Sequence, residues 1–312
     1  MSDVLRKGTL NIKWTEPLVK ISGGAPCAVI IPVYKDVDKL TKFEEKSIER
    51  TVQVLGGKYE IILLCGKSLK CDTYSEKFGY DFSFCKCSDE FFMSQKSYSD
   101  LCEKYELYDV FSMYEYILIC QTDAWVFEDR LEYFMGLGYD YIGAIHMLKS
   151  SGKGARVGNG GFSLRKPAKF SEVCKKTDFN QFKYTLYEDC AFSIRLKREF
   201  NIAPVEVAFE FGWQEQPRVA YELTGKLPMG CHNPMKNNWN FWREHIKLSE
   251  EVFDDGKARA LVGDVKFAIR PKYDRNVLSK ANDGVRRVRL NPPSSDSPFA
   301  RHVMIKRPGR PY

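Results

Sequence analysis

Short apolar runs alternate with amphipathic stretches along the first part of this chain, and this alternation indicates its fold. Residues 25–35, APCAVIIPVYK, and 59–66, YEIILLCG, are apolar runs with the length of a buried strand. Between them, 39–56 places apolar residues close to helical spacing, and Gly56–Gly57 mark the end of the helix. A strand, a helix and a second strand in this order predict a parallel βαβ unit with a right-handed crossover.

The same reasoning extends the prediction along the chain. Further strands are expected at 116–120, at 139–145 and in a β-like segment after Glu206. Further helices are expected at 129–138, 167–176 and 185–200, with another ending within 109–116. The stretch 67–106 is expected to be irregular, and 227–237 is rich in turn residues. We therefore expect an α/β fold with a mixed, mainly parallel sheet flanked by helices.

The positive charge of the chain is concentrated at its carboxyl end. The 312 residues include 48 Lys and Arg against 41 Asp and Glu, a net charge of +7. Residues 266–312 alone hold 12 Lys and Arg against 3 Asp and Glu, a net charge of +9, and they lack periodicity. We expect an N-terminal extension at 1–24, a folded domain at 25–265 and a basic, Pro- and Ser-containing extension at 266–312. This extension is either solvated or in contact with an anionic membrane surface, and we expect no nucleic-acid partner.

Apolar runs of transmembrane length and a signal peptide are both missing from the sequence, which favours a cytoplasmic protein, with the inner face of a membrane as a peripheral site. Ten cysteines in a large chain without an export signal are expected to be free thiols. Cys85 and Cys87 form a single C-x-C, which is a weak signal for zinc.

Candidate chemistry begins at Asp123, the one charged residue of 116–127. A carboxylate at the end of a buried strand is either a polar strand terminus or an acid placed where a parallel sheet opens to its ligand. Farther along the chain come a glycine-rich segment at 157–165, VGNGGFSLR, an acidic pair at Glu188–Asp189 and a histidine in GCH, 230–232. The chain contains neither a GxGxxG nor a Walker A sequence.

These motifs, in this order, resemble those of nucleotide-sugar glycosyltransferases with the GT-A fold, a Rossmann-type nucleotide-binding fold. The resemblance is closest to an uncharacterised glycosyltransferase-like family of bacterial, fungal and viral proteins. It covers roughly residues 25–240 and rests on AVIIPVYK, YEYILICQTDAWVF, GYDYIGA, VGNGGFSLR, the ED pair and GCH. It implies transfer of a sugar from a nucleotide-sugar donor, UDP-linked by preference, to a hydroxyl of a glycan or lipid-linked acceptor in surface polysaccharide or glycan synthesis.

The resemblance also implies roles for individual residues. Asp123 matches the first acid of the D-x-D motif that holds Mn²⁺ or Mg²⁺, but Trp125 occupies the place of the second acid, and His232 matches a late histidine that completes such metal sites. Asp189 matches the catalytic base of inverting enzymes, and its neighbour Glu188 would bind hydroxyls or cap the helix. Contacts with the donor or acceptor are expected from a further set of residues, namely Lys35, Trp125, Arg156, Asn159, Gly160, Gly161 and Lys236.

Each of these residues also has an ordinary structural explanation. Glu188 and Asp189 could be helix-capping acids, His232 a turn histidine bonded to backbone, and the glycines requirements of a tight turn. Two other functions are alternatives at the level of the whole chain. One is a sugar-nucleotidyltransferase, which would need a glycine- and arginine-rich signature that PVYKDVDKL does not offer. The other is a non-catalytic protein that binds nucleotide sugars or anionic surfaces.

Overall fold

The computed structural model describes residues 14–23, 25–147, 155–182 and 187–252. Met1–Ser150 and Ala155–Ala268 group into one compact unit, and the second unit, Ser151–Gly154 with Ile269–Tyr312, lies outside the described residues. The basic extension expected at 266–312 therefore also lies outside them. In the described part of the chain, no helix has the length and apolar character needed to cross a membrane.

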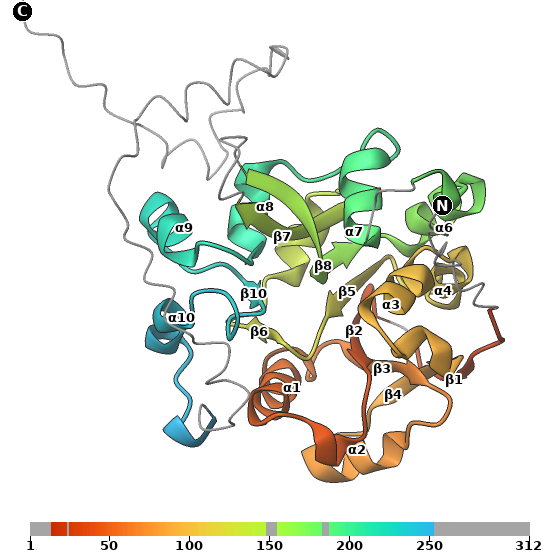
Figure 1. Ribbon diagram of the computed structural model, residues 1–312, viewed down its shortest axis with the longest axis horizontal. Coiled ribbons are helices and arrows are strands. Elements are labelled where there is room, and N and C mark those ends of the chain that lie inside the picture. Colours follow the sequence, from red (N-terminus) through yellow and green to blue (C-terminus); the bar gives the residue numbers. More distant parts are fainter. Residues whose placement is uncertain (1–13, 24, 148–154, 183–186, 253–312) are drawn as a thin grey trace, which may run out of the picture. The chain divides into compact units, whose positions relative to one another are not determined.

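A single mixed sheet organises the described residues, in the strand order β1-β4-β3-β2-β5-β8-β7-β9-β10-β6 (Figure 1). Its strands are β1 Leu18–Lys20, β2 Cys27–Val33, β3 Glu60–Gly66, β4 Ser83–Cys87, β5 Tyr116–Cys120, β6 Ala124–Val126, β7 Tyr141–Met147, β8 Ala155–Arg165, β9 Gly212–Trp213 and β10 Gly230–His232. The expected α/β fold with helices flanking a mixed sheet is confirmed. The edge strand β1 precedes residue 25, so the sheet begins within the segment expected to be an N-terminal extension.

Parallel pairing joins β2, β3, β4 and β5, the central strands in the first half of the sheet. β2 pairs in parallel with both β3 and β5, and β3 pairs in parallel with β4. Helix α1, Lys42–Leu55, makes the crossover between β2 and β3, and Thr41 with Glu44 forms a capping box at its start. The second half is more mixed, because β8 is antiparallel to both β5 and β7.

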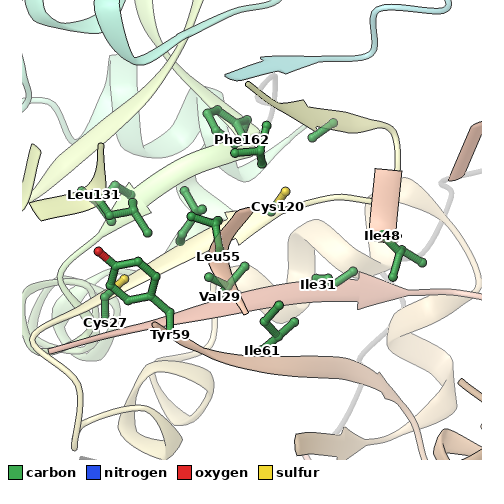
Figure 2. Close-up of a cluster of buried hydrophobic side chains, with 14 of the residues drawn as sticks. Cys27, Val29, Ile31, Ile48, Leu55, Tyr59, Ile61, Cys120, Leu131 and Phe162 are labelled. Atoms are coloured by element: carbon green, nitrogen blue, oxygen red, sulfur yellow. The ribbon is translucent and has the colours of Figure 1, made fainter. Parts of the chain in front are cut away.

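Helices cover both faces of the central strands, as the alternation of β2 residues shows. Cys27, Val29 and Ile31 belong to a cluster with β3 and α1, in which Ile48 and Leu55 lie opposite the strands (Figure 2). Ala28 and Ile30 belong to the opposite cluster. That second face packs against α3 Gln95–Cys102, α4 Tyr105–Val110 and α6 Pro167–Lys176, which lie together in Figure 1. The remaining α-helices are α2 Cys71–Phe78, α5 Leu131–Gly136, α7 Glu188–Cys190, α8 Val205–Phe211, α9 Pro217–Thr224 and α10 Trp239–His245.

Three predictions about local structure were wrong. The stretch 67–106 is not irregular, because it contains α2, β4 and α3, each too short to show a clear period. The segment after Glu206 alternates apolar and acidic residues like a strand but forms α8, which starts after Pro204 and buries Ala208 and Phe211 one turn apart. The helix expected at 185–200 is short, since α7 passes at once into a π-helix, Ala191–Arg195; residues 183–186 lie outside the described residues.

Candidate active site

Asp123 and His232 are brought together by the pairing of β6 with β10. Asp123 lies in the turn between β5 and β6, and His232 ends β10 opposite Ala124. The backbone N–H of Asn233 donates to the carbonyl of Asp123 (2.9 Å), which fixes the two turns against each other. As a result, His232 Nε2 lies 3.2 Å from Asp123 Oδ1. The sequence identified both residues, and the structure makes them neighbours.

Oxygen atoms surround both nitrogens of the His232 ring. Nε2 lies 3.0 Å from Gln121 Oε1 as well as near Asp123, and Nδ1 lies 3.3 Å from Gln214 Oε1. A neutral imidazole has one N–H donor and one lone pair, so it can satisfy only one of these two sides. With Nδ1–H donating to Gln214, the Nε2 side requires a second proton or a cation.

Asp123 keeps a partly open position, with 38% of its side chain exposed. Burial alone would raise its pKa, but His232 and Lys236 outweigh burial and lower the pKa of Asp123 below its ordinary value. Lys236 is exposed on the turn after β10. Lys35, by contrast, is paired with Glu44 (Nζ to Oε2, 2.8 Å), and Glu44 also accepts a hydrogen bond from Thr122 next to Asp123 (3.3 Å).

Trp125, at the place of the missing second acid, points into the protein. It is 8% exposed and belongs to the cluster around α9 and α10. Its ring centroid lies 5.9 Å from that of Phe43 on α1. Trp125 therefore packs in the core, and a contact with the donor stays a prediction.

The glycine segment forms an irregular bulge in β8. Gly143 of β7 pairs with Ser163, whereas the next residue, Ala144, pairs with Asn159. The Asn159 side chain closes the bulge, because its Oδ1 accepts from the backbone N–H groups of Gly161 (3.0 Å) and Phe162 (3.2 Å). Its amide nitrogen donates to Gln214. The Asn159 side chain thus forms its hydrogen bonds within the protein, and it has little remaining capacity to bind the sugar hydroxyl expected there.

Gly160 and Gly161 provide room for protein side chains. A Cβ on Gly161 would overlap with His232 Nε2 and with Gln121 Oε1, and a Cβ on Gly160 would overlap with Glu188 Oε1. The Cβ of Asp189 also lies 3.4 Å from that Gly160 position. Consecutive Cα atoms are about 3.8 Å apart, so the Asp123–His232 pair and the Glu188–Asp189 pair border the same short stretch of β8. The space expected for a sugar ring is partly filled by these side chains.

Glu188 is engaged in a buried network. Only 7% of its side chain is exposed; Ser99 donates to its Oε2 (2.7 Å), and Arg165 Nη2 lies 3.5 Å from its Oε1. Arg165 is itself buried and also donates to Tyr108 and to the carbonyl of Gly160. Burial is the main cause that raises the pKa of Glu188, with Asp189 adding to it and Arg165 opposing it. With so little of its side chain exposed, Glu188 is poorly placed to bind the hydroxyl expected there.

Asp189 faces His146, a residue that sequence reasoning missed. His146 Nε2 lies 3.6 Å from Asp189 Oδ2, an ion-pair distance that is too long for a direct hydrogen bond. Burial alone would raise the pKa of Asp189, but His146 and Arg156 outweigh it and lower that pKa. Arg156 is held beside the pair by Ser193, whose Oγ accepts from Nη1 (2.9 Å). In the described part of the chain, Asp189 Oδ1 is buried and has no hydrogen-bond partner.

The other missed residues are Gln121, Gln214 and Arg165, which contact predicted residues, and Glu215, which contacts His146. Gln214 and Glu215 follow β9 directly, and they contact His232 and His146, respectively. Their signal in the sequence is faint, because a polar pair after a two-residue strand has no characteristic spacing. His146 could have been singled out as a histidine at the end of the apolar run YIGAI.

The Asp123–His232 pair offers an incomplete metal site. In the described residues, no group of three or more His, Cys, Asp or Glu side chains is arranged to hold a metal ion. Asp123 Oδ1, His232 Nε2 and Gln121 Oε1 nevertheless converge, and an oxygen-rich set with one imidazole suits Mn²⁺. These residues fit a cation that takes its remaining ligands from phosphate oxygens.

Comparison with known proteins gives a family match and several distant structural likenesses. A family model described as "Protein of unknown function (DUF5672)" matches residues 81–232, a range that contains Asp123, Gly160, Gly161, Asp189 and His232. No curated protein sequence matches the chain.

Among solved structures, the apo-form glycosyltransferase GlyE of Streptococcus pneumoniae TIGR4 is similar at 15% identity and a TM-score of 0.47, over 76% of this chain. This chain spans only 64% of the length of that protein. A glycosyltransferase involved in glycosylation of the major capsid of PBCV-1 is similar at 15% identity and a TM-score of 0.38, over 72% of this chain and 100% of that one. A putative glucose-1-phosphate thymidylyltransferase from Bacillus anthracis is similar at 13% identity and a TM-score of 0.37, over 57% and 85%, respectively.

Proposed function

We propose that this protein is a glycosyltransferase that moves a sugar from a nucleotide-sugar donor to a hydroxyl of an acceptor with inversion at the anomeric carbon. One observation carries the proposal. Asp189, an ionised carboxylate with a lowered pKa, borders the same bulge of β8 as the Asp123–His232 pair. Inverting transfer needs these two functions close together, namely a base for the acceptor and a charged partner for the departing diphosphate.

In this mechanism Asp189 accepts the proton of the acceptor hydroxyl as its oxygen attacks the anomeric carbon. A carboxylate with a lowered pKa is a weak base toward a free alcohol. It suffices for a hydroxyl that is already forming its new bond, because that hydroxyl becomes strongly acidic in the transition state. Glu188 and Arg165 act through Asp189, since their buried pair fixes the start of α7 against Gly160.

Asp123 and His232, with Gln121, are the residues that would hold Mn²⁺ or Mg²⁺. A bound cation would balance the negative charge that develops on the leaving diphosphate. Gln214 supports this role because its acceptor at Nδ1 directs the Nε2 lone pair of His232 toward Asp123 and Gln121. Lys236 is a further candidate for contact with the diphosphate, because its positive charge already acts on Asp123 and helps to lower the pKa of that residue. Lys35 would have to exchange Glu44 for a phosphate.

The donor in this proposal is a UDP-sugar by preference, and the acceptor is a glycan or lipid-linked hydroxyl of surface polysaccharide or glycan synthesis. The test is a screen of UDP-, GDP- and CMP-sugars for transfer and hydrolysis, with and without Mn²⁺. We expect one nucleotide class to be consumed and Mn²⁺ to accelerate its turnover. Release of pyrophosphate from a nucleoside triphosphate and a sugar phosphate would instead identify a nucleotidyltransferase. Failure to turn over any of these substrates would contradict the proposal.

A further inference from the structure

His146 lies between two carboxylates, and this arrangement favours the positively charged form of its ring. Its Nε2 faces Asp189 Oδ2 at 3.6 Å, and its Nδ1 lies 3.3 Å from Glu215 Oε1. The side chain is only 12% exposed, and that of Asp189 only 14%. A neutral imidazole would turn a lone pair toward one of the two carboxylates, whereas an imidazolium has an N–H on each side. The Nε2 side is an ion-pair contact, since Nε2 is buried and has no hydrogen-bond partner among the described residues. The geometry therefore favours the protonated ring.

The charges around His146 also favour its protonated form. Burial alone would lower the pKa of His146, but Asp189 and Glu215 outweigh burial and the opposing charge of Arg156, so this pKa is raised. Among the described residues, the charged and titratable groups packed around the pair are Tyr141 on β7, Arg156 on β8, Glu188 and Cys190 on α7, and Glu215 after β9.

We propose that the His146 imidazolium, anchored by Glu215, is a positioning residue for Asp189 that holds Oδ2 and so fixes the orientation of the carboxylate that receives the acceptor proton. This inference rests on the proposed function, because it assigns a role to groups behind the same base. It explains why the two oxygens of Asp189 differ, with Oδ2 turned toward a cation and Oδ1 buried without a partner among the described residues. Once His146 loses its proton, Asp189 loses the charge that orients its carboxylate.

The inference predicts an alkaline limb in the pH profile of kcat with its midpoint at the pKa of His146. The ring can be followed directly by NMR of histidine-labelled full-length protein, because the chain has four histidines and His146→Gln removes one signal. In Glu215→Gln one of the two carboxylates is neutralised, so the NMR pKa of His146 and the alkaline limb should both move to lower pH by the same amount. Glu206→Gln is the matched control, since it removes the same charge from an exposed site on α8 and should move neither.

The variant His146→Gln should keep the fold, lower kcat by about tenfold or more, and lose the alkaline limb. A merely structural histidine would lower the melting temperature and leave the limb in place. Two results would overturn the positioning role and leave the glycosyltransferase proposal intact. One is activity that rises as His146 loses its proton. The other is an alkaline limb that does not move in Glu215→Gln although the NMR pKa of His146 does. If the wild-type protein has no transfer activity, while Asp189→Asn still lowers the NMR pKa of His146, the ion pair exists but the proposed function is wrong. The catalytic role of His146 then fails with it.

Discussion

Gly160 and Gly161 face two different halves of the candidate site, and this makes alanine substitutions there informative. A Cβ on Gly161 meets the ring of His232, whereas a Cβ on Gly160 meets the carboxylate of Glu188. Neither side chain can move freely, because His232 is held by Gln214 and Glu188 by Arg165 and Ser99. The two glycines are therefore required by side-chain packing, besides any room they leave for a ligand.

Gly161→Ala should displace His232 from Asp123 and so weaken the binding of Mn²⁺ in the presence of nucleotide. Gly160→Ala is the comparison variant, since it should disturb Glu188 and leave the Asp123–His232 pair in place. Each substitution should cost roughly 1–3 kcal/mol in unfolding free energy because of overpacking. Titration calorimetry with Mn²⁺ and nucleotide, alongside thermal unfolding, separates the effects. Equal metal affinity in the two variants would show that His232 is not a ligand.

At the scale of elements, Arg165 connects β8 to the helices that carry the acidic pair. Its guanidinium reaches Tyr108 on α4 and Glu188 on α7, while Glu188 in turn accepts from Ser99 on α3. A buried ion pair adds little to stability by itself, but removal of one partner leaves the other charged and buried.

Arg165→Met should therefore destabilise the fold by about 3–5 kcal/mol, measured by urea unfolding. The exposed pair of Arg218 with Glu244 (3.9 Å) provides the control, and Arg218→Met should change stability by less than about 1 kcal/mol. A double variant, Arg165→Met with Glu188→Gln, should recover part of the loss because the uncompensated charge is gone. If Arg165→Met unfolds at the same urea concentration as the wild type, the network does not fix α7.

The amino ends of three strands are joined by another acid, Glu60, at the start of β3. Ser83 and Tyr114 donate to its carboxylate, as do the backbone N–H groups of Ser22 (2.8 Å) and Gly23 (3.0 Å). Burial alone would raise the pKa of Glu60, but these hydrogen bonds lower it from 4.5 to about 2. An acid with a lowered pKa in the folded state stabilises the fold above its ordinary pKa, and this contribution disappears as the pH falls toward the folded value.

We accordingly expect the wild type to lose stability as the pH falls from 4.5 toward 2, and Glu60→Gln to lose less over the same interval. Urea midpoints measured at several pH values test this. Glu49→Gln, on the exposed side of α1, is the matched control and should follow the wild type. Parallel curves for the wild type and Glu60→Gln would mean that Glu60 has an ordinary pKa in the folded protein.

At the scale of the whole molecule, the sequence predicted the fold class and the residues on strand and helix ends, but not the contacts that join them. The βαβ opening could be predicted because β2 and β3 are continuous apolar runs and α1 has apolar residues close to helical spacing. Helix α8 was misread because its residues alternate, and its burial against the sheet is set by tertiary packing. Asp123 stood out as the one charged residue of its stretch, whereas Asp189, in an acidic pair, and His232, in a turn, became candidates through the order of the motifs. His146 and Glu215 did not, since they are 69 residues apart in sequence and meet only in the folded chain.

The proposed mechanism makes Asp189 the base of the transfer, and this assignment also decides whether inversion is the right stereochemistry. Asp189→Asn preserves the shape of the side chain but removes its capacity to accept a proton. A residue that served only to cap α7 would cost about 1 kcal/mol of stability when replaced and would leave the folded protein active.

The most direct measurement is therefore kcat for sugar transfer by Asp189→Asn, beside the dissociation constant of the donor nucleotide in the same variant. We expect kcat to fall by roughly 10²–10⁴-fold while nucleotide affinity stays close to that of the wild type. Glu222→Gln on α9, which removes an exposed carboxylate, should change neither value. A kcat close to that of the wild type in Asp189→Asn, with only a lowered melting temperature, would contradict the role of Asp189 as the base.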